Sequence, residues 1–98
     1  MDEKTLQFLK VLRELVRGRN SRQVYTVVAA RQLGIDIQTE PGHREYEKHL
    51  ADLELAEYLL RHPNPNLSAY GVYLITDKGI AVAEEFSTSS KPRARKVL

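Results

Sequence analysis

A short segment from position 43 to 48 holds side chains whose types and spacing suit recognition of another molecule. They are His43, Arg44, Glu47 and Lys48. On a helix, residues three or four apart share one side, so these four are expected to form one polar surface. Arginine and lysine donate to phosphate oxygens or to the guanine edge, histidine can donate to either, and a carboxylate can accept from cytosine. We therefore expect this surface to contact double-stranded DNA.

The same charges allow a plainer interpretation. Arg44 follows Glu40 by four residues, and Asp52 follows Lys48 by four. Pairs at this spacing are common on solvated helices and stabilise them slightly. In this interpretation the cations only form solvated ion pairs on the helix surface and bind no partner. The sequence leaves this alternative open.

Two carboxylate and histidine pairs raise the question of a metal site. His43 with Glu47, and Glu45 with His49, are each one helical turn apart. At about 100° per residue the two pairs differ in heading by roughly 160 to 200°, so they do not converge on one ion. We expect no metal and no cofactor here, and we expect His49, beside Leu50 and Leu53, to be a partly buried packing residue.

No arrangement typical of an enzyme is present. The sequence has no cysteine, and its five glycines are scattered rather than gathered into a phosphate loop. It also lacks the nucleophile elbow of hydrolases. Acidic residues on exposed helices stay solvated and gain little of the pKa shift that general acid catalysis requires. We expect a protein without enzymatic activity.

The helix that carries the polar surface is expected from Pro41 to about Leu55. Proline fits the first turn of a helix. Tyr46, Leu50 and Leu53 recur at helical spacing and predict the inward side. At about 100° per residue from Tyr46, both Arg44 and Lys48 lie opposite that side, so they are expected to point outward.

An amphipathic helix is expected at the start of the chain, from Thr5 to Arg17. Its apolar stripe spans about 160°, which is wide for a helix that covers one side of a small domain. One interpretation is a homodimer interface, formed by Leu6, Phe8, Leu9, Leu12, Leu15 and Val16. The other is that the stripe is all core, since in a chain of 98 residues each helix must bury much of itself.

The following segment allows two assignments. A second helix capped by Ser21 or Thr26 would run to Leu33 and stop at Gly34. Alternatively, the β-branched stretch at 24–28 begins as a short strand, and the helix starts only at Thr26. A connector over 35–40 then leads to the third helix.

A hairpin and a last helix are expected after the third helix. The strands are predicted at Glu57–Leu60 and Tyr70–Ile75, and residues 62–66, rich in Pro and Asn, form an open loop between them. Thr76 is expected to cap a helix from Asp77 to about Phe86. The fold class is therefore α+β and mostly helical, with one domain at 1–86.

Residues 87–98 form a basic tail that we expect to be flexible. The tail holds four of the 15 lysines and arginines, which leaves 11 against 13 acidic residues in the remainder. Such a tail can add salt-sensitive phosphate contacts without sequence information, or it can only solubilise the chain. Its cations are Lys91, Arg93, Arg95 and Lys96.

Three segments resemble a known family. Tyr73-Leu74-Ile75-Thr76-Asp77-Lys78-Gly79-Ile80-Ala81 resembles the strand-to-helix junction of MarR-like and PadR-like transcriptional regulators, which are winged helix-turn-helix proteins. The stretch from Thr26 to Gly34 is similar to their second helix, and that from His49 to Glu54 to the end of their recognition helix. The likeness covers roughly residues 22–86.

This resemblance implies a three-helix core, a β-hairpin wing and a C-terminal helix. It also implies that the third helix enters the major groove while the wing holds phosphates. Arg61 and His62 lie where the wing leaves its first strand, so they become candidate phosphate contacts. The connector is longer than the usual tight turn, and the wing tip at 64–66 is without cations.

The resulting hypothesis is a cytoplasmic DNA-binding transcriptional regulator. No apolar run reaches the roughly 18 residues of a membrane span, and the first residues are acidic, so neither a signal peptide nor a membrane is expected. The alternative is a winged helix used only for protein contacts, which the net charge of −2 over residues 1–90 favours.

Overall fold

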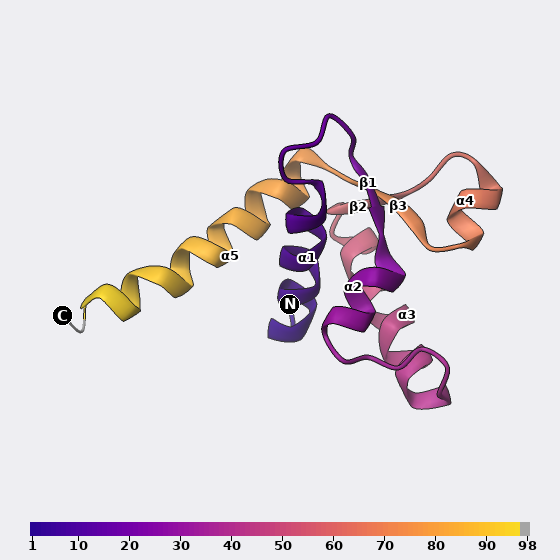
Figure 1. Ribbon diagram of the computed structural model, residues 1–98, viewed down its shortest axis with the longest axis horizontal. Coiled ribbons are helices and arrows are strands. Elements are labelled where there is room, and N and C mark those ends of the chain that lie inside the picture. Colours follow the sequence, from indigo (N-terminus) through magenta and orange to yellow (C-terminus); the bar gives the residue numbers. More distant parts are fainter. Residues whose placement is uncertain (97–98) are drawn as a thin grey trace.

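The computed structural model describes the backbone of residues 1–96 and the side chains of residues 1–87. It is an α+β fold, mostly helical, as predicted (Figure 1). The helices are α1 (Glu3–Val16), α2 (Thr26–Gln32), α3 (Glu40–Leu55), α4 (Pro65–Ala69) and α5 (Asp77–Lys96). The strands are β1 (Gln23–Tyr25), β2 (Leu59–Arg61) and β3 (Val72–Ile75).

The strands form one small antiparallel sheet in the order β1-β3-β2. Val24 pairs with Tyr73, and Leu59 with Ile75, and all four of these side chains are buried. The strand interpretation of residues 23–25 is therefore correct, and a second helix starting at Ser21 is wrong. Thr26 opens α2 but does not cap it, because its hydroxyl donates to the carbonyl of Gly71 instead.

The core lies between α1, α2, α3, the start of α5 and the inner side of the sheet. Phe8, Leu9 and Leu12 of α1 are fully buried, and Val16 is 5% exposed. The dimer interface predicted through these four residues is therefore wrong, because their side chains are already covered by their own chain. Leu6 and Leu15, the other two residues of that prediction, remain partly exposed.

The hairpin is shorter and less open than predicted. β2 begins at Leu59 rather than Glu57, and β3 begins at Val72 rather than Tyr70. The predicted open loop is also wrong at its end, since α4 starts at Pro65, where the side chain of Asn64 accepts from the backbone N–H of Asn66 at 3.0 Å. A proline at the first helical position and an asparagine cap are both favourable helix starts.

The last helix is longer than predicted. α5 continues past Phe86 to Lys96 and leads away from the body of the molecule (Figure 1). This backbone overturns the predicted helix end at Phe86. No helix in the part of the chain that the structure describes is both long and apolar enough to cross a membrane.

The Thr76 cap is confirmed, and its surroundings explain the Thr-x-x-Gly motif. The hydroxyl of Thr76 accepts from the N–H of Gly79 at 2.9 Å and donates to the carbonyl of Glu57 at 2.8 Å. A Cβ atom at Gly79 would overlap the carbonyl oxygen of Tyr58. The start of α5 can therefore lie against the α3–β2 turn only with glycine at this position.

Candidate nucleic-acid interface

The start of α3 is fixed by the connector that precedes it. The side chain of Thr39 caps the helix by accepting from the N–H of Gly42 at 3.1 Å, and Pro41 occupies the first turn as predicted. Thr39 also donates to the carbonyl of Asp36 at 2.8 Å. A Cβ at Gly42 would overlap that same carbonyl oxygen. The connector thus lies directly against the first turn of α3.

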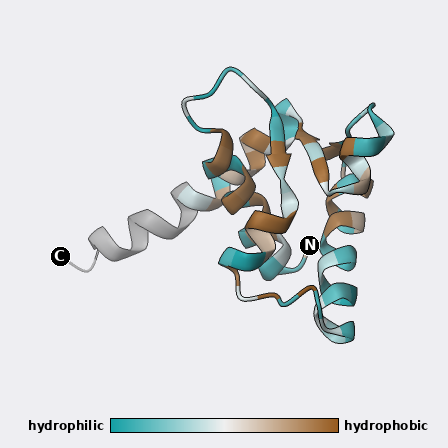
Figure 2. Cartoon of the chain, turned by 45° about the vertical axis from the view of Figure 1, so that its right-hand side comes forward, coloured by the Kyte–Doolittle hydropathy of each residue, from teal (hydrophilic) through white to brown (hydrophobic). Residues whose placement is uncertain are grey.

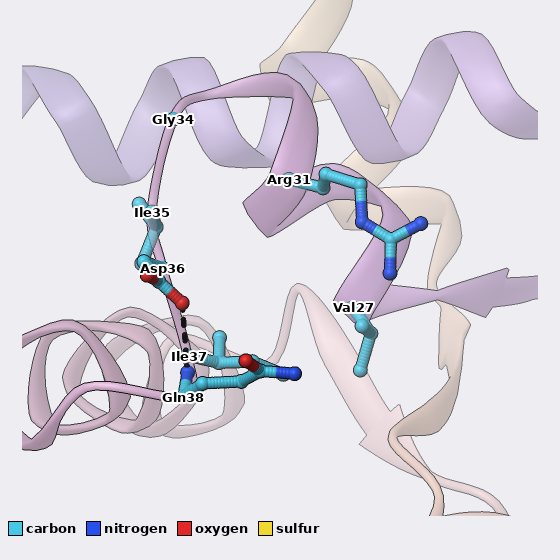
Figure 3. Close-up of a pocket in the computed structure, with 7 residues that line it drawn as sticks. All are labelled: Val27, Arg31, Gly34, Ile35, Asp36, Ile37 and Gln38. Carbon is cyan, nitrogen blue, oxygen red and sulfur yellow. Dashed lines mark hydrogen bonds between the residues drawn. The ribbon is translucent and has the colours of Figure 1, made fainter.

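A hollow of about 340 Å³ lies between the connector and α2 (Figure 3). Val27 and Arg31 of α2 lie on one side of it, and residues 34–38 of the connector on the other. The carboxylate of Asp36 accepts from the N–H of Gln38 at 3.0 Å, which closes a local turn. The unusual connector is therefore a defined turn that sets where α3 begins.

The buried side of α3 is attached through Tyr46 to the start of α2, which in turn bonds to the residue before β3. The hydroxyl of Tyr46 lies 2.7 Å from that of Thr26, which in turn donates to the carbonyl of Gly71 at 2.6 Å. Gly71 has a φ of +84°, and a Cβ there would come within 2.7 Å of the Tyr46 hydroxyl. Burial raises the pKa of Tyr46, so its hydroxyl stays protonated and able to donate.

A second polar connection joins α3 to α1. His49 is 2% exposed; its Nδ1 lies 2.7 Å from Oγ1 of Thr5, and its Nε2 lies 3.2 Å from the carboxylate of Glu45. Lys4 contacts that carboxylate at 2.7 Å. Hydrogen bonds from Lys4 and then from His49 lower the pKa of Glu45. His49 is therefore a fully buried hydrogen-bonded residue, not the partly buried packing residue predicted.

The exposed side of α3 carries the predicted recognition residues. Arg44 and Lys48 are 77% and 60% exposed and point away from the core, as predicted. His43 and Glu47 are exposed beside them, with Nε2 and the carboxylate oxygen 3.2 Å apart. All four residues therefore share one accessible surface, which we call the α3 surface.

The ion pairs expected of a solvated helix are also present on the α3 surface. Arg44 lies 3.8 Å from Glu40, and Lys48 lies 3.4 Å from Asp52. Over its whole length α3 holds five carboxylates and two cations. Neutral pairs and surplus acid therefore surround the two cations, which weakens the positive potential at this surface.

Arg61 lies beside α3, whereas His62 contacts the sheet and the start of the loop that follows it. Arg61 is exposed and its Nε donates to Glu54 at 3.1 Å, and this hydrogen bond raises the pKa of the guanidinium. The ring of His62 crosses the sheet, with its Nε2 2.9 Å from Nε2 of Gln23. Its Nδ1 accepts from the N–H of Asn64 at 3.0 Å. Arg61 thus borders the α3 surface, while His62 holds the hairpin.

A second hollow, of about 430 Å³, separates α3 from α4 and β3. Glu47 and Glu54 line it from α3, Ser68 from α4, and Tyr73 from β3. Burial and then the charge of Glu54 raise the pKa of Tyr73. His43 and Arg61 also line the hollow, so it presents both hydrogen-bond acceptors and donors, as base edges do.

The four cations of the predicted tail lie outside the residues whose side chains are described. The helix backbone that carries Lys91, Arg93, Arg95 and Lys96 is part of α5. Over the described residues, no group of three or more histidine, cysteine or acidic side chains is arranged to hold a metal ion.

Comparison with known proteins gives no family for this chain. No protein-family model, no curated protein and no solved structure matches it. The functional conclusion therefore depends on the residues and their geometry alone.

Proposed function

We propose that this chain is a winged helix-turn-helix domain of a transcriptional regulator that binds double-stranded DNA. In this proposal α3 is the recognition helix, and the hairpin of β2 and β3 with α4 is the wing. His43, Arg44, Glu47 and Lys48 face the major groove, and Arg61 contacts a phosphate beside it.

The observation that carries the proposal is the exposure of Arg44 and Lys48 on one side of α3, which is held at a fixed orientation beside the hairpin. The helix is anchored through Tyr46 to the start of α2 and through His49 to α1. Its 16 residues span about 24 Å, and its width matches the roughly 12 Å major groove. The element order and the sheet order β1-β3-β2 also fit a three-helix core followed by a wing.

A second candidate, a winged helix that binds a protein, is favoured by the charge of α3. The helix has three more carboxylates than cations, and each exposed cation there has an acidic partner. A polyanion gains less at such a surface than a neutral or cationic protein segment. Both candidates use the same surface, so the partner must be tested directly.

The test measures binding of a fluorescent random duplex to the full chain over a series of salt concentrations. Contacts with Z phosphates give a log–log slope near −0.9Z, whereas a protein-binding surface gives almost no duplex affinity and no slope. We expect the double variant Arg44→Ala with Lys48→Ala to lower duplex affinity about tenfold to hundredfold, because two exposed contacts of about 1 kcal/mol each together contribute about 2 kcal/mol.

The matched control is Lys10→Ala with Arg31→Ala, which removes the same charge from α1 and α2. Neither residue has an ion pair among the described side chains, and neither lies on the α3 surface. The control is expected to change affinity by less than threefold. Equal losses in both variants, with unchanged thermal unfolding, would reject the assigned surface.

A further inference from the structure

A second cationic region lies at the opposite end of the molecule from α3. The loop between α1 and β1, residues 17–22, crosses the top of the molecule in Figures 1 and 2. A hollow of about 250 Å³ lies between this loop, α1 and the start of α5. Three arginines line it, together with one serine, one glycine and two apolar residues: Arg13, Arg19, Arg22, Ser21, Gly18, Val16 and Ile80. No carboxylate is among its lining residues.

The arginines keep hydrogen-bond donors for a ligand. Arg13, with its side chain only 18% exposed, directs Nε and Nη2 at Glu84, at 3.2 and 2.7 Å. Arg22 uses Nη2 to contact Asp77 at 2.8 Å. A guanidinium has five N–H donors, so each still has donors that these contacts do not use. The two contacts also hold both guanidinium groups in place.

The rest of the loop adds hydrogen-bond donors and lets a ligand approach the backbone. Arg19 is exposed and has no ion pair among the described side chains. The Ser21 hydroxyl accepts from the N–H of Gln23 at 3.0 Å, which leaves its own hydrogen for another acceptor. Gly18 has a φ of +76° and open space where a Cβ would stand, so a ligand can approach the backbone closely.

We infer that this hollow binds a phosphate group. Arginine forms planar, paired hydrogen bonds with phosphate oxygens, and this fork geometry favours phosphate over a single chloride ion. The site differs from the α3 surface because three arginines line one hollow, and the acidic partners of two of them, Glu84 and Asp77, lie outside its lining. The ligand is either a free phosphorylated small molecule or a phosphate of a nucleic-acid backbone.

The experiment titrates the isotope-labelled full chain with sodium pyrophosphate and follows backbone amide shifts, with ionic strength held constant by KCl. We expect saturable shifts centred on Gly18, Arg19 and Ser21. Arg19→Gln is expected to weaken binding about fivefold to tenfold, because one charge-assisted contact is lost. The matched control Arg31→Gln, an exposed arginine of α2, is expected to leave it unchanged.

Shifts that do not saturate, or equal weakening by Arg19→Gln and Arg31→Gln, would overturn the proposal. A second titration with a short duplex assigns the source of the phosphate. If the duplex competes with pyrophosphate for the same amides, the ligand is a backbone phosphate of a nucleic acid. If the duplex leaves pyrophosphate binding unchanged, the ligand is a free phosphorylated molecule. Either result supports the site.

A titration of the Arg44→Ala and Lys48→Ala double variant with pyrophosphate separates this site from DNA binding at α3, since pyrophosphate binding in the hollow is expected to be unaffected.

Discussion

Two histidine and carboxylate pairs on α3 have the same spacing but opposite environments. His43 with Glu47, and Glu45 with His49, are both i,i+4 pairs with an N···O distance of 3.2 Å. The side chains of the first pair are 53% and 65% exposed, whereas that of His49 is 2% exposed. Spacing along a helix therefore determines that a pair forms, and the side of the helix determines what the pair does.

The difference comes from α1. This helix covers the second pair and supplies Thr5, whose hydroxyl satisfies the other ring nitrogen of His49. It also supplies Phe8, whose ring centroid lies 5.7 Å from that of His49. A buried polar side chain is tolerated when its hydrogen-bonding groups are paired, and here both ring nitrogens have partners. The inner pair is thus part of the fold, and the outer pair is available to a ligand.

The largest expected effect is on stability, at the inner pair. His49→Ala is expected to lower the free energy of unfolding by about 2–4 kcal/mol, because it opens a cavity beside Phe8 and leaves the Thr5 hydroxyl without a partner. Urea denaturation of the variant and the parent chain measures this difference.

The matched control for His49→Ala is His43→Ala on the other side of the same helix. An exposed substitution of this kind is expected to change the free energy of unfolding by less than about 0.5 kcal/mol. A similar cost for both variants would mean that burial does not separate the two pairs.

The sequence was sufficient to predict α1, α2, α3 and α5, but not α4 and not every boundary. The repeating apolar positions of α1 and α3 gave those helices, because an apolar side must face the core whatever the tertiary detail. It did not reveal α4, a helix of five residues, because a single turn has too few positions for a periodic pattern. The end of α5 was missed because Ser, Thr and Lys after Phe86 resemble a loop in composition.

The sequence also predicted part of the candidate site, where helical periodicity alone determines which side chains face outward. The outward direction of Arg44 and Lys48 followed from helical geometry alone. The partner of His49 did not, since Thr5 is 44 residues away in the sequence and meets it only through the packing of α1 on α3. A polar residue on the apolar side of α1, four positions before Leu9, was the available signal. The arginine hollow likewise depends on contacts between α1, the α1–β1 loop and α5.

A smaller effect is expected on the pH dependence of stability. The folded chain lowers the pKa of Glu45 below its ordinary value of 4.5 through Lys4 and His49. The ionised form is therefore favoured by folding; its stabilisation is complete above the unfolded pKa and is lost as pH falls through the folded pKa. Thermal unfolding followed from pH 7 to pH 3 is expected to show a shallower decline for Glu45→Gln than for the parent chain.

The control for this pH series is Glu47→Gln at the outer pair. The exposed carboxylate of Glu47 pairs with His43 among the described residues, and no lysine there forms an ion pair with it. We expect its unfolding profile to follow that of the parent chain at every pH. A shallower decline in Glu47→Gln than in Glu45→Gln would contradict the assignment of the inner pair to the fold.

The smallest expected effect is on DNA affinity, at the outer pair. Glu47→Gln removes one exposed negative charge from the α3 surface, and single exposed charges contribute at most about 1 kcal/mol. Affinity for a random duplex is therefore expected to rise about twofold to fivefold at low salt and to return toward the parent value as salt screens the charge. Glu14→Gln on α1 changes the net charge equally at another exposed ion pair, and it is expected to have little effect. Equal gains from the two variants would show that net charge, rather than the position of Glu47, governs binding, and would remove the outer pair from the proposed interface.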